Sequence, residues 1–218
     1  MFPSRLVSVL GKGALENNYS VSFDGTNDYV DLATPTFMNG KSAFTISAWA
    51  NLDTAGNFNA IATNTELLVG FSSGKPSVSY RETDNTRNRK IATNALSTGQ
   101  WYHIVGTWDQ GGDGEIRIYV DGSYVAQSYN DGGASTASVL KDATDADIGR
   151  YTGGSEYMDG LINEVAVWDV ALDADAVTAL YNSGTPLDAS ADSGNYDNSG
   201  DLQGYWRNDG DTTWTDRS

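Results

Sequence analysis

Short segments in which apolar and polar residues alternate, separated by clusters of Gly, Asn and Asp, limit this chain to few folds. Residues 19–23 read YSVSF, and residues 115–120 and 123–128 alternate in the same way on either side of Asp121 and Gly122. Successive side chains of a strand point to opposite faces of a sheet, and Asp-Gly supplies the positive φ values that a two-residue hairpin turn requires. The pattern predicts an all-β sandwich of antiparallel strands.

The alternating segments run along most of the chain. We expect strands at 19–23, 29–32, 44–50, 59–63, 67–71, 77–81, 101–108, 115–120, 123–128, 145–149 and 161–168. One short helix is expected at 174–181, where Asp173 can cap the first turn and Gly184 can end the helix. The chain is therefore predicted to consist of strands followed by one late helix.

The composition divides the chain into three parts. Residues 1–18 are interpreted as an N-terminal arm and residues 19–184 as one domain. Residues 185–201 show almost no apolar periodicity, which predicts an exposed acidic connection. Residues 202–206 (LQGYW) return to aromatic character, so the last part of 185–218 either packs on the domain or begins a truncated second repeat. The sequence leaves both possibilities open.

Aspartate outnumbers glutamate 23 to 6, and the 29 acidic and 13 basic residues give a formal net charge of −16. Aspartate favours turns more than helices, so this excess agrees with a turn-rich β protein. The negative field repels phosphate, and we expect no nucleic-acid partner. With no Cys and one His, the chain can form neither a disulfide nor a Cys/His zinc site.

No segment predicts membrane insertion or export. The N-terminal apolar run spans only residues 6–10, which is shorter than the apolar core of a secretion signal. No window approaches the roughly 18 apolar residues required to cross a bilayer. We expect a protein that is cytosolic, trimmed from a secreted precursor, or assembled into a particle inside a cell.

Four segments together resemble the laminin-G-like, concanavalin A-like jelly-roll family, in its pentraxin-related branch. They are SFDGTNDYVDL at 22–32, FTISAWANL at 44–52, the Trp-x-His strand and Tyr-Val-Asp-Gly hairpin at 101–122, and the Asn-Glu-Val-x-x-Trp strand with its helix at 148–184. The resemblance implies a two-sheet antiparallel jelly-roll sandwich, the concanavalin A-like lectin/glucanase fold, with one concave sheet and one short C-terminal helix.

The same resemblance implies a structural calcium ion near the first hairpin. The matching oxygen donors are Asp24, Asn27 and Asp28, joined by backbone oxygens or by Glu164. Calcium takes about six to eight oxygen ligands, which carboxylates on turns can supply. A tight turn held by Asx hydrogen bonds explains the same residues without any ion, and both interpretations stay open.

Two groups of residues are candidates for glycan binding, because sugars are held by aromatic faces and planar hydrogen-bonding side chains. The first is a polar, basic stretch in an acidic chain, made of Tyr80, Arg81, Asp84, Asn85, Arg87 and Arg89. The second would lie on the concave sheet, at alternating positions of neighbouring strands, and comprises His103, Arg117 and Tyr119. The alternative explanations are an exposed hairpin tip at 81–90 and a structural histidine at 103.

The glutamates argue against glycoside hydrolysis. Retaining enzymes of this superfold use two carboxylates about 5–5.5 Å apart, carried on one strand as Glu-x-Asp-x-x-Glu. The six glutamates stand at positions 16, 66, 82, 115, 156 and 164, and no two of them have that spacing. His103 lies in an apolar strand without a nucleophile elbow, so a Ser-His-Asp triad is not predicted either. We expect a protein that is not an enzyme.

The sequence therefore favours a non-catalytic surface module. The sequence of its first strands resembles that of bacteriophage structural proteins. The main hypothesis is therefore a virion protein that forms a capsid decoration, a tail or a fibre and adheres to glycans or to the host surface. Such a protein would assemble in the host cytoplasm as a homo-oligomer or with other virion proteins. The alternatives are a secreted, extracellular carbohydrate-binding module of a larger protein and a glycoside hydrolase of the same superfold.

Overall fold

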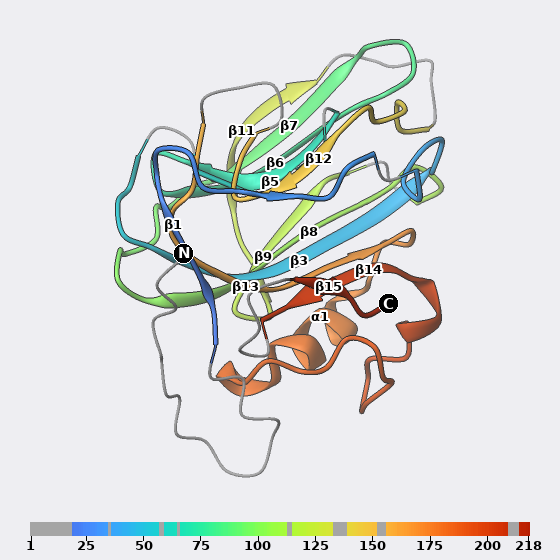
Figure 1. Cartoon of the computed structure of the whole chain (residues 1–218). Helices are drawn as coiled ribbons and strands as arrows, with labels where there is room; N and C mark the ends of the chain where they lie inside the picture. The colour runs from blue at the N-terminus through green and yellow to red at the C-terminus, as the bar shows by residue number, and fades with distance from the viewer. Residues whose placement is uncertain are drawn as a thin grey trace.

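The computed structural model describes residues 19–34, 36–56, 59–64, 66–112, 115–132, 139–151, 156–208 and 214–218. Two antiparallel sheets pack face to face, and a helix covers the outer face of one of them (Figure 1). The predicted two-sheet sandwich with one short helix is confirmed. The expected N-terminal arm at 1–18 lies outside the described residues.

The first sheet, here called the β3 sheet, has the strand order β10-β9-β8-β3-β13-β14-β15, and β1 also pairs with β13. Its strands are β1 (Val21–Asp24), β3 (Ala43–Leu52), β8 (Trp101–Asp109), β9 (Arg117–Val120), β10 (Ser123–Tyr124), β13 (Asp159–Trp168), β14 (Leu202–Arg207) and β15 (Thr215–Asp216). The predicted Asp-Gly hairpin is present, because Val120 of β9 pairs with Ser123 of β10 and the two residues between them, Asp121 and Gly122, have φ values of 50° and 74°.

The second sheet, here called the β6 sheet, has the strand order β11-β7-β6-β5-β4-β12-β2. Its strands are β2 (Val30–Asp31), β4 (Asn59–Asn64), β5 (Leu67–Ser72), β6 (Lys75–Arg81), β7 (Arg87–Ala92), β11 (Gln127–Gly132) and β12 (Ala146–Ile148). The sequence did not predict β7, and residues 123–128 divide between β10 and β11. Strand β7 (RNRKIA) has few apolar residues, which explains why alternation did not reveal it.

The core lies between the sheets and follows the predicted alternation. On β3 the inward side chains include Phe44, Ile46 and Ala48, which are 0–3% exposed. Gly106 on β8 faces Val78 on β6, and a Cβ atom at Gly106 would lie 2.5 Å from Val78 Cγ2. The two sheets therefore approach each other so closely at this point that only glycine fits.

A second apolar layer covers the outer face of the β3 sheet. Helix α1 (Ala174–Tyr181) has the predicted bounds, and the Asp173 carboxylate accepts a hydrogen bond from the backbone N–H of Ala176 at 2.8 Å. The helix ends at Asn182, which has a φ of 46°, rather than at the predicted Gly184. Within the described part of the chain, no helix is long and apolar enough to cross a membrane.

The sequence predicted that residues 185–201 form an exposed acidic connection, but part of this segment is buried. Tyr196 is fully buried against Trp168, whose indole Nε1 donates a hydrogen bond to the Tyr196 hydroxyl at 2.9 Å. The same hydroxyl donates to the backbone oxygen of Ala189 at 2.6 Å, and burial raises the pKa of Tyr196 to about 12. After this segment, β14 pairs with β13 and extends the β3 sheet.

Candidate functional site

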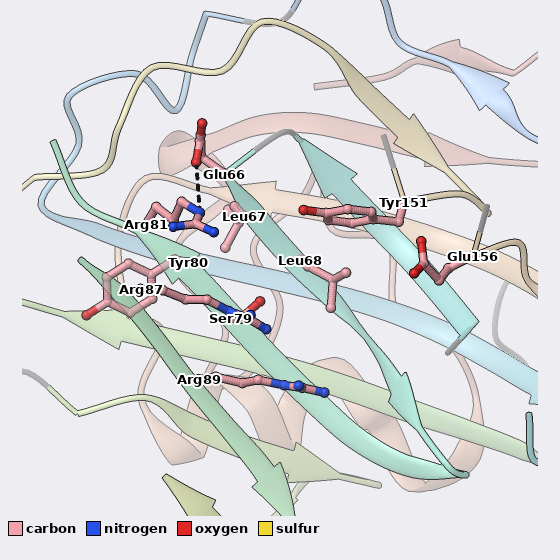
Figure 2. A pocket seen from close by; sticks show the side chains of 10 residues that line it. All are labelled: Glu66, Leu67, Leu68, Ser79, Tyr80, Arg81, Arg87, Arg89, Tyr151 and Glu156. Carbon is pink, nitrogen blue, oxygen red and sulfur yellow. Dashed lines mark ion pairs between the residues drawn. The ribbon is translucent and has the colours of Figure 1, made fainter. Parts of the chain in front are cut away.

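A pocket of about 280 Å³ opens on the outer face of the β6 sheet, the face turned away from the core. Figure 2 shows it between β5–β6–β7 and the segment around Tyr151 and Glu156. The residues that line it are Glu66, Leu67, Leu68, Ser79, Tyr80, Arg81, Arg87, Arg89, Tyr151 and Glu156. Pockets of this kind, apolar in part with a few converging polar groups, are the usual sites for small ligands.

Strand register brings three arginines to this face. Arg81 of β6 lies directly opposite Arg87 of β7, and Ser79 lies opposite Arg89. Positions two apart on a strand share a face, so these four side chains all lie on the side of β6 opposite Val78, whose side chain is in the core. In Figure 2 the arginine side chains extend along the pocket from β6 and β7.

Glu66 fixes one end of the arginine row. Its carboxylate lies 3.5 Å from Arg81 Nε and 2.9 Å from Lys141 Nζ. Arg81 also donates to the backbone oxygen of Asn85 at 3.3 Å, and Arg89 Nε donates to Ser77 Oγ at 3.3 Å. Arg87 is exposed to solvent. Two of the guanidinium groups are thus held in place by neighbouring groups of the protein.

The facing wall comes from the connection between β12 and β13. The Tyr151 backbone N–H donates to the backbone oxygen of Glu156 at 2.9 Å, and Arg150 forms an isolated antiparallel bridge with Tyr157. These contacts hold the two ends of the connection together. In Figure 2 Tyr151 and Glu156 face the arginines across the pocket. No sequence pattern indicated either residue, because they meet β6 and β7 only through the order of strands in the sheet.

The structure therefore brings together three of the predicted glycan-binding residues, Arg81, Arg87 and Arg89. Tyr80 differs, because its ring packs in the core with centroids 4.4 Å from Trp108 and 5.7 Å from Phe44. Burial, and secondarily the charge of Glu82, raise the pKa of Tyr80. Tyr80 borders the pocket, but its ring belongs to the core and the residue is 3% exposed, so it offers little surface to a ligand on the outer face.

Asp84 and Asn85 form the turn between β6 and β7. The Asp84 carboxylate accepts a hydrogen bond from the backbone N–H of Thr86 at 2.8 Å, and Asn85 adopts a φ of 67°. The predicted basic loop at 81–90 is thus a hairpin in which Arg87 and Arg89 belong to a strand. Strand geometry directs both arginines to one face, which a flexible loop would not do.

The second predicted group lies on the other sheet and does not meet the first. The His103 side chain lies on the outer face of the β3 sheet, beneath α1, and the residue is only 1% exposed. Its ring stacks on Trp49 at 5.3 Å and on Tyr181 of α1 at 6.2 Å. Burial lowers the pKa of His103 to about 3. The prediction that His103 faces a ligand is wrong, because α1 covers this face.

Tyr119 is buried in the same way as His103. It is 4% exposed in the layer between the β3 sheet and α1, and burial raises its pKa. Arg117 is partly exposed on the same strand, β9. Neither residue lines the pocket on the β6 sheet, so the two predicted groups do not form one glycan site.

The four residues predicted to hold calcium do not form one site either. Asp24 Oδ1 accepts backbone hydrogen bonds from Thr26 at 2.8 Å and from Asn27 at 3.3 Å, while Asp28 accepts one from Asp24 N at 3.1 Å. These bonds are those of an Asx turn. The neighbouring strand places Asp159, not Glu164, opposite Asp24.

Glu164 lies five residues further along β13, at an irregularity of the strand where its φ is 52°. It is 6% exposed beneath the C-terminal segment. Tyr205 donates a hydrogen bond to its carboxylate, and Arg207 Nε lies 4.0 Å from Oε1. The prediction that Glu164 completes the calcium site is wrong, because these contacts place it elsewhere in the β3 sheet.

A different group of acids lies together in the β6 sheet. One carboxylate oxygen from each of Asp31, Asp145 and Asp147 falls within 4.8 Å of the others. Asp147 is fully buried and lies opposite Asp31 in the strand register. Burial raises the pKa of Asp147, Arg150 opposes that shift, and the charges of Asp145 and Asp31 add to it. The Asp-Ala-Asp spacing at 145–147 was the only sign of this group in the sequence.

Comparison with known proteins identifies the fold family. The model of the concanavalin A-like lectin/glucanases superfamily matches residues 24–178. No curated protein is significantly similar in sequence to this chain. Several solved structures resemble it at low sequence identity, which shows a shared fold.

One is a Bacteroides ovatus protein that has been proposed to bind carbohydrate, with 22% identity and a TM-score of 0.62 over 89% of this chain and 55% of that one. Another is domain 4 of AbnA, an extracellular GH43 arabinanase from Geobacillus stearothermophilus, solved with arabinotriose. It has 16% identity and a TM-score of 0.58 over 83% of this chain and 81% of that one.

A third is Trypanosoma rangeli sialidase, with 14% identity and a TM-score of 0.53 over 77% of this chain and 27% of the sialidase. This chain thus spans about half of the Bacteroides protein and a smaller part of the sialidase. The family match and the two-sheet sandwich agree with the resemblance in the sequence. The chain belongs to the concanavalin A-like lectin/glucanases superfamily.

Proposed function

We propose that this domain is a non-catalytic carbohydrate-binding module and that its ligand lies in the pocket on the outer face of the β6 sheet. The observation that carries the proposal is the convergence of Arg81, Arg87 and Arg89 on a partly apolar pocket faced by Tyr151. Guanidinium groups offer several fixed N–H donors to sugar hydroxyls, and a tyrosine ring offers an apolar face and a hydroxyl.

The fold supports the same proposal. Domain 4 of the arabinanase, which was solved with arabinotriose, shares the sandwich over most of its length. The Bacteroides protein that has been proposed to bind carbohydrate shares it as well. These similarities favour the alternative of a carbohydrate-binding module over the main hypothesis of a virion protein. The virion role, the extracellular or virion location, the oligomeric state and the lack of catalytic activity stay predictions.

Binding to a panel of soluble polysaccharides tests the proposal, by affinity electrophoresis followed by calorimetry with the best ligand. The variants Tyr151→Ala and Arg89→Gln should each weaken binding at least tenfold, because both side chains line the pocket. The matched control is Arg117→Gln, which removes the same charge from the other sheet and should bind like the wild type. A panel that yields no ligand, or variants that bind like the wild type, would contradict the proposal.

A further inference from the structure

The arginine pocket concentrates positive charge in a strongly acidic protein. The whole chain carries a net charge of −16, yet three of its 13 basic residues line this one pocket. Arg81 and Arg87 stand directly opposite each other on neighbouring strands, and Arg89 follows two residues after Arg87. Like charges directly opposite each other destabilise a sheet. The Arg81–Arg87 pair therefore lowers the stability of the β6 sheet, and side-chain packing gives no reason for its presence.

The carboxylates of the pocket do not balance this charge evenly. Glu66 is shared between Arg81 and Lys141 at one end of the arginine row. Glu156 lies on the facing wall, next to Tyr151 (Figure 2). The pocket therefore has a positive side, formed by β6 and β7, and an opposite side that offers a carboxylate and a phenol. Such a polarity would orient an asymmetric ligand.

We infer that this pocket selects carbohydrates that carry a negatively charged group, a carboxylate or a sulfate. The inference rests on the proposed carbohydrate-binding function and names its ligand class. The planar fork of a guanidinium group matches two oxygens of a carboxylate or sulfate. Hydrogen bonds between such charged groups are stronger than those between neutral groups. The acidic group lies against Arg87 and Arg89, and the sugar hydroxyls face Tyr151 and Glu156.

Pairs of polymers that share one backbone, of which only one member is charged, test the ligand class. Polygalacturonate and its fully methyl-esterified form share one backbone, and dextran sulfate and dextran form a second pair that separates sulfate from carboxylate. We expect the charged member of at least one pair to bind at least tenfold more tightly. The Arg87→Gln variant should lose most of that preference, while Arg117→Gln on the other sheet should keep it.

The outcomes separate this inference from the proposed function. If the neutral member binds as well as the charged one and Tyr151→Ala abolishes both, the module binds carbohydrate but the inference is wrong. If neither polymer pair nor any neutral polysaccharide binds, both proposals fail. If Arg87→Gln leaves the preference for the charged polymer unchanged, the pocket is not its source and the inference is overturned.

Folding of the variant can be checked independently of binding. Because Arg81 and Arg87 repel each other across the strands, Arg87→Gln should unfold in urea at the same midpoint as the wild type or a higher one. A loss of binding in a variant of unchanged stability then reports on the ligand contact. A sharply destabilised Arg87→Gln variant would instead assign Arg87 a structural role and overturn the inference.

A second inference concerns the acids of the β6 sheet and rests on a separate observation. Asp147 Oδ2 accepts hydrogen bonds from Arg150, with Nε at 2.9 Å and Nη2 at 2.7 Å. Within the described part of the chain, the buried Oδ1 of Asp147 has no hydrogen-bond partner. A buried oxygen without a partner is costly, and here it belongs to a carboxylate grouped with Asp31 and Asp145 within 4.8 Å.

We propose that Asp31, Asp145 and Asp147 bind a calcium ion. Calcium is a hard cation that prefers carboxylate oxygens, and its charge would offset three acids that Arg150 alone does not neutralise. The site lies where β2 and β12 pair, directly before the connection that carries Tyr151. The ion would therefore stabilise the strand that leads into the facing wall of the arginine pocket.

Thermal unfolding with EDTA, Ca²⁺ or Mg²⁺ tests the site. We expect millimolar Ca²⁺ to raise the Tm by several degrees over EDTA, since a ligand that binds only the folded state stabilises it. Asp145→Asn should abolish the rise, and Asp24→Asn, in the first hairpin, should retain it. A wild type without a rise, or a rise that survives in Asp145→Asn, would overturn the proposal; a rise lost only in Asp24→Asn would place the ion at that hairpin.

Discussion

The imidazole Nε2 of His103 lies 2.7 Å from the hydroxyl oxygen of Ser47 on the neighbouring strand, and both residues are buried beneath α1. The ring of Trp49 stacks on the His103 imidazole, with the ring centroids 5.3 Å apart, and on Tyr181 of the helix at 5.8 Å. Together these contacts join the helix to the β3 sheet through a neutral, buried histidine.

The first prediction follows from the pKa of His103, which burial lowers to about 3. The unfolded chain takes up a proton near the usual pKa of about 6.5, so its histidine binds more protons than the folded one below that pH. Stability contributed by the neutral His103 is thus full above pH 7 and is lost as the pH falls toward 3. The loss is up to about 1.4 kcal/mol per pH unit.

Urea unfolding of the wild type and of His103→Gln at several pH values between 7 and 4 measures this effect. Glutamine keeps a group that can bond to Ser47 but does not titrate. We expect the difference in unfolding free energy between the two proteins to shrink by about 3 kcal/mol between pH 7 and pH 4. Two curves that stay parallel over this range would show that His103 is protonated equally in both states.

The second prediction concerns the hydroxyl of Tyr196, which accepts a hydrogen bond from Trp168 and donates one to Ala189. Tyr196→Phe would leave the buried indole N–H and the backbone oxygen without these partners. The expected loss is about 1–3 kcal/mol of unfolding free energy. Tyr124→Phe is the control, since Tyr124 is 56% exposed, and should change stability little. Equal effects of the two substitutions would contradict the buried network.

The third prediction tests the close approach of the two sheets. Gly106→Ala would place a methyl group 2.5 Å from Val78 Cγ2, so the Val78 side chain or the strands that carry the two residues must shift. We expect a loss of about 1–3 kcal/mol in chemical denaturation, the usual range for overpacking a core. Gly200→Ala serves as the matched control, because a Cβ atom there would meet nothing within 4 Å. A stable Gly106→Ala protein would mean that the sheets are further apart.

The fourth prediction is that residues 202–218 are required for folding of the domain. Strand β14 pairs with β13 and buries Tyr205, and this segment supplies both Tyr205 and Arg207 to the buried Glu164. A chain that ends at residue 201 would lack β14, so β13 would lose a ladder partner and the two apolar layers would lose Trp206 and Tyr205. Loss of one buried aromatic side chain typically costs about 3–5 kcal/mol. Circular dichroism should show a lower or absent thermal transition; an unchanged Tm would show that the segment is not part of the domain.

Local periodicity predicted the elements of this protein well. The alternation in 44–50 and 161–168 located β3 and β13, and the Asp173 cap located α1 at its exact bounds. It did not predict β7, because Arg87 and Arg89 point outward and the strand has few apolar side chains. The burial of Tyr196 was also missed, since one aromatic residue in an acidic segment has no periodicity.

The sequence predicted only part of the candidate site. The local reversal of charge at 81–90 marked the three arginines, since they are neighbours along the chain. Glu66 and Glu156 come from other parts of the sequence, and their place beside the arginines depends on strand order and on the connection after β12. Likewise, the pairing of Asp31 with Asp147 arises because β2 and β12 are adjacent.

The sequence by itself determined that this chain forms alternating strands with one late helix, because side-chain alternation and helix caps are local properties of consecutive residues. Only the tertiary structure decided which faces stay open. His103 and Arg89 both stand at strand positions that point away from the core between the sheets. Tyr181 of α1 covers His103, whereas Arg89 lines a pocket. Coverage depends on which distant segments pack on a sheet, and strand periodicity carries no information about that choice.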